Sequence, residues 1–227
     1  MFGLDVLTVG SYLILASNSF RCSVPEPPQI NINPVTQDIR YNFDHSRENL
    51  DRYRAHVEGK PMEVDSSTGG LRYDQPKINT RMEWGIRTDK RADVSCMWYS
   101  QINVDIELSP LIYIASDYKT PTCRDEIMRH EEMHVQIDRE VINKYARRMG
   151  ADLQNMLRQT GAVGPFASDR LKEMEGKLSR RVENVLQTQI RQLKAELDTR
   201  QAQIDTPAEY KRISLICHAA ERRGNGG

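Results

Sequence analysis

Hydrophobic and polar residues alternate most regularly in the segment Ile102–Leu108, which reads INVDIEL. This pattern is typical of a strand with one buried face. Weaker patterns predict further strands at Ile39–Phe43, Gly70–Tyr73, Thr80–Arg87 and Asp93–Tyr99, and Leu111–Ala115 is a short apolar segment. The Pro-rich segment Val24–Val35 is expected to be an extended connector, and Arg47–Val57 a short helix with Ser46 as its N-cap.

From Arg124 onward, the apolar positions change to a helical period. The spacing predicts one helix from Arg124 to near Gly161 and a second from Ser168 to about Ile204, joined by a turn with the sequence GAVGPFAS. Each would contain about 35 residues and be roughly 50 Å long. An unbroken hairpin of that length is expected to project beyond a compact body unless Gly150 and Gly176 kink it. A last helix is expected at Ala208–Glu221, after Pro207.

The composition is balanced, with Lys+Arg and Asp+Glu both at 32. This balance argues against a nucleic-acid partner, which would require clustered cations. The mean hydropathy of −0.65 argues against stable insertion into a membrane.

The apolar run Val6–Ala16 is too short to span a bilayer. It resembles the h-region of a signal peptide, although Asp5 and the lack of Lys or Arg before it also allow a folded amphipathic start. Residues 1–23 are therefore expected to be a signal peptide and leader, and the protein to be periplasmic or secreted. In an oxidising compartment, the four cysteines would form one or two disulfides. Cys96 with Cys123 is the favoured pair, and buried free thiols are the alternative.

The first long helix contains RHEEMHV, in which His130, Glu131 and His134 form an HExxH motif. Spacing of four residues places both imidazoles on one helix face, where their nitrogens can converge on one Zn²⁺ ion. Glu131 lies beside them as the candidate catalytic base, which would take a proton from a water activated by the metal. The alternative is a solvated helix face on which Glu131 and Glu132 pair with nearby arginines.

A catalytic zinc site requires a third protein ligand. Because the second helix returns antiparallel, residues near 194–198 are expected to reach the level of the histidine pair, while the last helix could fold over it. His218 is the favoured ligand, with Glu196 and Glu209 as alternatives and Asp198 as a further candidate. Asp138 lies eight residues from His130, about 12 Å along a helix. It is therefore expected either to support His134 from behind or to be a surface carboxylate. Tyr210 is a candidate oxyanion donor or a packing residue.

The segments RYNF, MEWGIR, VSCMW, INVDIELSP and RHEEMHVQID, between Arg40 and Met149, together resemble a family of secreted bacterial proteins described as zinc-dependent proteases. The resemblance implies export, an α+β body, and zinc held by His130 and His134 with Glu131 as the catalyst. The family's C-terminal part carries a further Tyr and His, for which Tyr210 and His218 are the candidates here.

The expected fold is therefore α+β, with a mostly antiparallel N-terminal sheet packed on the HExxH helix and a long C-terminal helical hairpin. Residues 24–160 would form a zincin-like domain and residues 161–227 a helical segment returning to the site. The expected function is that of a zinc metallopeptidase acting on a peptide or protein, with strand Ile102–Leu108 near the cleft holding an extended substrate. The alternative is a non-catalytic interaction protein whose hairpin recruits a partner or a second copy, with a structural metal or none.

Overall fold

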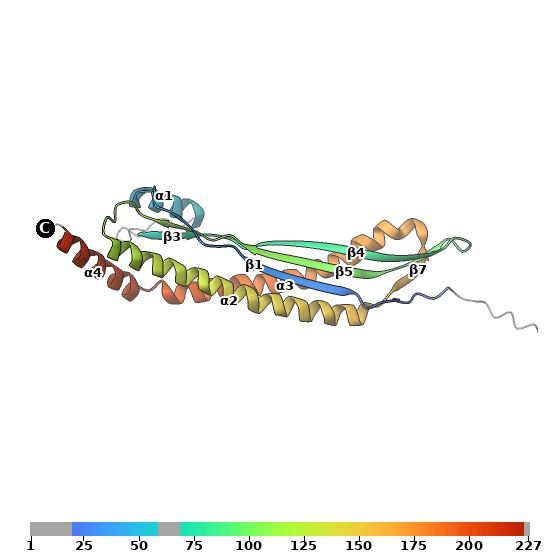
Figure 1. The fold of residues 1–227 in the computed structure, drawn as a ribbon. Coiled ribbons are helices and arrows are strands. Elements are labelled where there is room, and N and C mark those ends of the chain that lie inside the picture. The colour runs from blue at the N-terminus through green and yellow to red at the C-terminus, as the bar shows by residue number, and fades with distance from the viewer. Residues whose placement is uncertain (1–19, 59–68, 225–227) are drawn as a thin grey trace, which may run out of the picture.

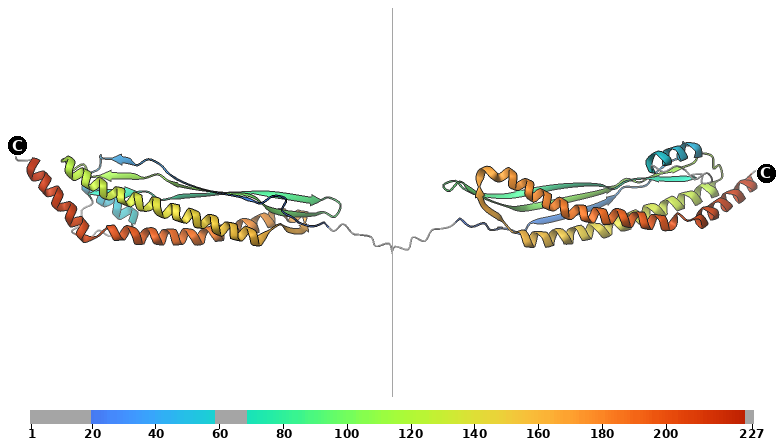
Figure 2. Two further views of the ribbon diagram at one scale, coloured as in Figure 1. Left: turned by 60° about the horizontal axis from the view of Figure 1, so that its bottom comes forward. Right: turned by 180° about the vertical axis from the view of Figure 1, so that it is seen from behind.

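The computed structural model describes residues 20–58 and 69–224. The predicted signal-peptide run Val6–Ala16 lies outside this part. The molecule is elongated, with strands and helices running along one long axis (Figures 1 and 2). Strands dominate the N-terminal half and long helices the C-terminal half, which confirms the expected mixture of α and β structure. No helix of the described part is long and apolar enough to cross a membrane.

The larger sheet has the order β1-β5-β4, and β7 also pairs with β5. Its strands are β1 (Gln29–Thr36), β4 (Lys77–Asp89), β5 (Val94–Leu108) and β7 (Val163–Ala167). β4 and β7 are antiparallel to β5, but β1 is parallel to it, so the sheet is mixed. The connector predicted at Val24–Val35 largely forms β1. Its one proline within the strand, Pro34, is tolerated because an edge strand needs hydrogen bonds on one side only. Ile30 and Ile32 pack on the core.

β5 combines the two strands predicted at Asp93–Tyr99 and Ile102–Leu108. Its inward residues Ile102, Val104, Ile106 and Leu108 are fully buried. The expectation that Ile102–Leu108 holds a substrate is wrong, because β1 and β4 already pair with both edges of this segment.

A smaller sheet has the order β2-β6-β3, formed by Arg40–Asn42, Leu111–Ile114 and Gly70–Tyr73. β2 is parallel and β3 antiparallel to β6. Helix α1 (Arg47–Glu58) precedes β3 in the chain, and Ser46 Oγ accepts a hydrogen bond from the Asn49 backbone N–H at 3.4 Å. Ile112 and Ile114 of β6 belong to a buried cluster with Cys123, Ile127 and Val135 of α2.

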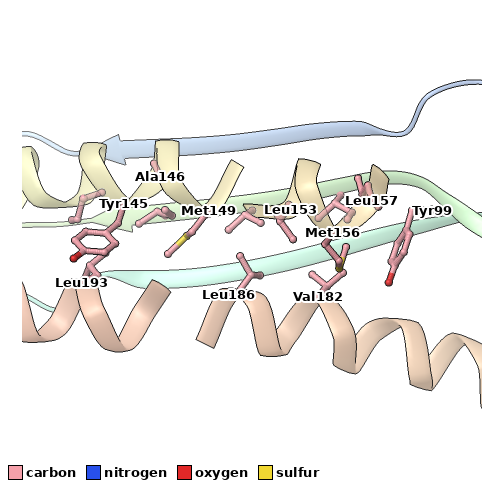
Figure 3. Packing of buried hydrophobic residues seen from close by; sticks show 14 of the residues in the cluster. Tyr99, Tyr145, Ala146, Met149, Leu153, Met156, Leu157, Val182, Leu186 and Leu193 are labelled. Atoms are coloured by element: carbon pink, nitrogen blue, oxygen red, sulfur yellow. The ribbon is translucent and has the colours of Figure 1, made fainter. Parts of the chain in front are cut away.

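Helices α2 (Pro121–Thr160) and α3 (Leu171–Ile204) form the predicted hairpin. Its apolar seam is buried together with side chains of β5 in one cluster, which includes Met149, Leu153, Val182, Leu186 and Leu193 (Figure 3). The hairpin therefore does not project as a bare element, because the long strands run beside it. Gly150 and Gly176 both lie within continuous helices.

The two long helices are offset along their axis. The predicted turn contains β7 and a 3-10 turn at Ser168–Arg170, so α3 begins beyond the end of α2 (Figure 1). Contacts between the helices show the resulting register. Lys144 lies 2.5 Å from Glu196, and Arg200 lies 2.6 Å from Glu140. Residues later in α3 than expected therefore reach the level of the HExxH motif.

Two disulfides link Cys22 to Cys96 and Cys123 to Cys217. The favoured pair Cys96–Cys123 is wrong, because Cys96 lies near the start of β5 and Cys123 in the first turn of α2. These two points are at opposite ends of the molecule (Figure 1). The second disulfide joins α2 to helix α4 (Pro207–Gly224). Both bonds are compatible with an exported protein.

Candidate metal centre

The two histidines of the HExxH motif face each other on α2. The spacing of four residues brings their Nε2 atoms to 3.3 Å, with ring centroids 5.0 Å apart. His130 is 3 % exposed and His134 is 7 % exposed. The two ring nitrogens are directed at the same point. Because little water reaches them, they require a polar group or an ion that both can contact.

Asp205 supplies that partner. It is the C-cap of α3, and its Oδ1 lies 3.2 Å from His130 Nε2 and 3.1 Å from His134 Nε2. In the part of the chain that the structure describes, these three side chains form a group whose ligand atoms lie within 4.8 Å of one another. Tyr210 of α4 donates a hydrogen bond to the same Oδ1 at 2.9 Å.

The triangle of donor atoms has the size that a tetrahedral zinc site needs. Zn–N and Zn–O bonds of about 2.0–2.1 Å in a tetrahedron place neighbouring ligand atoms about 3.3–3.4 Å apart. The three observed separations are 3.1, 3.2 and 3.3 Å. Two imidazoles and one carboxylate are also ligands that zinc accepts, so the residues present fit a Zn²⁺ ion with one position left for water or substrate.

The electrostatics of the group favour a cation. Partial burial raises the pKa of Asp205, but the hydrogen bond from His130 and the neighbouring His134 ring outweigh it and hold that pKa well below its usual value. Burial lowers the pKa of His130, but the hydrogen bond to Asp205 and the charge of Glu131 outweigh it and raise that pKa overall. Positive charge is therefore stabilised where the donor atoms meet.

Glu131 is buried beside the pair, and burial raises its pKa. β3 lies directly against this carboxylate. A Cβ atom added to Gly70 would lie 2.7 Å from Glu131 Oε1 and 2.6 Å from Ile127 Cγ2. The absence of a side chain at Gly70 therefore lets the strand approach the predicted catalytic base.

Asp138 is buried behind His134 instead of lying on the surface. It is 2 % exposed, forms an ion pair with Arg72 and accepts a hydrogen bond from Gln201 Nε2 at 2.7 Å. Gln201 in turn contacts His134 Nδ1. Asp138 thus supports His134 through an amide from α3.

The structure does not place His218, the favoured third ligand, in the group. It is exposed on α4 and lines a shallow depression with Leu215, Glu221 and Arg222. Cys217, its neighbour, points inward toward α2 and forms the disulfide with Cys123.

The carboxylates considered as alternatives lie elsewhere. Glu196 pairs with Lys144 and Tyr145 on the adjacent turns of α2, and Asp198 is exposed. Glu209 comes closer, with its Oε1 3.6 Å from His130 Nδ1, but this is the ring nitrogen that faces away from Asp205. It can support His130 from behind. Glu132, which departs from the usual uncharged position of the motif, accepts a hydrogen bond from Tyr41 at 2.6 Å.

Asp205 and Gln201 were not predicted as site residues, because a tight hairpin would have brought residues near 194–198 to the motif instead. The signal in the sequence was the spacing itself. Gln201 and Asp205 are four residues apart, as are His134 and Asp138, so two helix faces with matching periods meet. The register between the two helices could not be predicted, because it depends on the length of the segment that connects them.

No family model, no curated protein and no solved structure matches this chain. The centre is therefore interpreted from its own geometry.

Proposed function

We propose that the protein is a zinc-dependent hydrolase, most specifically a metallopeptidase, that uses His130, His134 and Asp205 as ligands and Glu131 as general base. The observation that carries the proposal is the convergence of three donor atoms, with separations suited to zinc, directly beside a buried glutamate. A ligand triad with an adjacent carboxylate is the minimum set for metal-assisted hydrolysis of an amide.

Bound zinc would polarise the substrate carbonyl and lower the pKa of the attacking water. The carboxylate of Glu131 would take a proton from that water and return it to the leaving amine. Burial raises the pKa of Glu131, which makes the carboxylate a stronger proton acceptor.

Tyr210 is proposed to act on the acidic ligand. Partial burial and the neighbouring Asp205 raise the pKa of Tyr210, so the phenol keeps its proton and donates a hydrogen bond to Asp205 Oδ1. This contact orients the carboxylate toward the two imidazoles. An oxyanion role for Tyr210 would require its hydroxyl to leave Asp205 during the reaction.

The competing function, a non-catalytic interaction protein built on the hairpin, loses its main support. The apolar seam of α3 is packed against α2 and β5. The two disulfides support a periplasmic or extracellular location for the enzyme, in which peptide or protein substrates would be met.

The test is the pair Glu131→Gln and Glu132→Gln in the full chain, loaded with Zn²⁺ and assayed on casein and on a mixture of fluorogenic peptides. Glu131→Gln should retain zinc and lose hydrolysis, whereas Glu132→Gln, one residue away, should keep both. Hydrolysis that survives in Glu131→Gln, or zinc content near zero in the parent protein, would overturn the proposal.

A further inference from the structure

Gln201 holds His134 with both ends of its side-chain amide. Its Nε2 donates to the backbone carbonyl of His134 at 3.1 Å and to Asp138 Oδ1 at 2.7 Å. A carbonyl and a carboxylate are both acceptors, so the nitrogen end of the amide must face them. The oxygen end, Oε1, is thereby left in contact with His134 Nδ1.

This orientation decides where the imidazole hydrogen lies. An amide oxygen only accepts hydrogen bonds, so Nδ1 of His134 must be the protonated nitrogen. In the neutral ring, Nε2 then carries a free lone pair. That atom is the one directed at His130 Nε2 and Asp205 Oδ1.

The amide is itself anchored from two sides. The second carboxylate oxygen of Asp138 forms an ion pair with Arg72 of β3. The Asp138 side chain in this ion pair is only 3 % exposed. Gln201 also lies one turn before Asp205 on α3. The same stretch of α3 therefore supplies one candidate ligand and the group that orients another.

His130 lacks an equivalent support. Its Nδ1 is buried without a hydrogen-bond partner, and Glu209 Oε1 lies 3.6 Å away. The two histidines are therefore held unequally, and His134 is the one whose ring is fixed before any ion arrives.

We infer that Gln201 is a positioning residue, which holds His134 in the tautomer that offers Nε2 to a divalent cation. Its consequence for zinc rests on the proposed function, but the tautomer itself is measured without metal. A failure of the positioning role is therefore distinguishable from a failure of the proposed zinc-dependent function.

The first experiment compares Gln201→Met with Gln203→Met in the full chain after treatment with a chelator. Both changes replace an amide with an apolar chain of similar length on the same helix, but Gln203 is exposed. Long-range ¹H–¹⁵N spectra of the His134 ring should show the Nδ1–H form in the parent and in Gln203→Met. In Gln201→Met, the ring should become a mixture of tautomers. An unchanged pure Nδ1–H signal in Gln201→Met would overturn the inference.

The second experiment measures Zn²⁺ affinity by competition with a chromophoric chelator. Loss of a group that orients a metal-binding histidine typically weakens metal affinity by roughly 10–100-fold, so Gln201→Met should fall in that range and Gln203→Met should match the parent. Equal affinities in Gln201→Met and the parent would overturn the positioning role.

A double variant, Asp138→Asn with Gln201→Glu, exchanges donor and acceptor along the same contact. After Gln201→Glu, a carboxylate oxygen still accepts from His134 Nδ1, although the hydrogen bond to the His134 backbone carbonyl is lost. Relative to Gln201→Met, the double variant should recover the Nδ1–H tautomer and most of the Zn²⁺ affinity. This variant also decides the question if Gln201→Met fails to fold, because a mixed tautomer in the folded double variant would contradict the inference. A pure Nδ1–H signal in a parent protein that binds no Zn²⁺ would support Gln201 as positioning residue while refuting the proposed hydrolase.

Discussion

Asp205 Oδ1 lies 3.1 Å from His134 Nε2, although 71 residues separate the two in the sequence. The contact exists because α3 is long enough, and offset far enough, for its C-cap to reach the HExxH face of α2. The candidate metal centre is thus formed by the hairpin register and not by the motif alone.

Replacing Asp205 with alanine should remove the third ligand. We expect Asp205→Ala to weaken Zn²⁺ binding by more than the roughly 10–100-fold that loss of an outer partner costs, because a direct donor is lost. Isothermal titration with Zn²⁺ measures the effect. Asp198→Ala, an exposed acidic residue in the preceding turns of α3, should bind as the parent does. Equal affinities in the two variants would exclude Asp205 as a ligand.

The stability of the metal-free fold and the stabilisation added by zinc should change with pH in opposite directions. The pKa of His130 is raised above its ordinary value of 6.5 by Asp205 and Glu131, despite burial. Its protonation therefore stabilises the metal-free fold fully below about pH 6.5, and this stabilisation is lost as the pH rises through the folded pKa. Zinc competes with that proton, so the stabilisation conferred by zinc should grow over the same range.

Thermal unfolding between pH 6 and 8, with and without Zn²⁺, measures how the metal-free stability and the zinc increment each change with pH. We expect the melting temperature of the chelator-treated protein to fall with rising pH and the increment on adding zinc to grow. His130→Gln should reduce the pH dependence of the melting temperature and of the zinc increment. A zinc increment independent of pH would mean that the ion does not displace a proton from this site.

Elements with a local signal were predictable from the sequence, and those set by distant partners were not. Gly70–Tyr73 was found as a strand with the bounds that the structure shows, because alternation and flanking turn residues mark it. β1 was missed because Pro34 and the three prolines just before the strand suggest a connector, and the segment becomes a strand only by pairing with β5. The His130 and His134 positions follow from helix geometry alone.

The candidate third ligand could not be predicted from the sequence of one helix. Asp205 reaches the site because β7 carries the chain along β5 before α3 begins. The five residues of β7, which were predicted to be part of a turn, therefore changed which residues of α2 and α3 lie side by side. The preferred disulfide failed for a similar reason, since β5 spans the distance between the ends where Cys96 and Cys123 lie.

Adding a methyl group at Gly70 should disturb catalysis more than metal binding. The new Cβ would lie 2.7 Å from Glu131 Oε1 and 2.8 Å from its Cγ, so the base must move or β3 must withdraw. We expect Gly70→Ala to lower turnover on casein while Zn²⁺ content stays near that of the parent. Gly150→Ala is the control, because its Cβ would meet only Ile32 at an ordinary 3.5 Å. Full activity in Gly70→Ala would show that the position of Glu131 is not critical.

Removing each disulfide should separate general stability from metal binding. The bonds close similar loops, with sequence separations of 74 and 94, so replacing either pair with serine should cost about 4–5 kcal/mol in the chain-entropy description. Only Cys123–Cys217 fastens α4, which carries Tyr210 and is otherwise buried against α2 through few apolar side chains. We therefore expect the Cys123→Ser, Cys217→Ser variant to bind Zn²⁺ more weakly than the parent.

The Cys22→Ser, Cys96→Ser variant is the matched control, because its disulfide lies at the far end of the sheet (Figure 1). It should unfold at lower denaturant concentration but bind Zn²⁺ with parental affinity at a temperature where it is folded. If both variants lose affinity equally, the effect of α4 is one of global stability. If neither does, α3 alone holds Asp205 in place, and the hydrogen bond from Tyr210 adds nothing to metal binding.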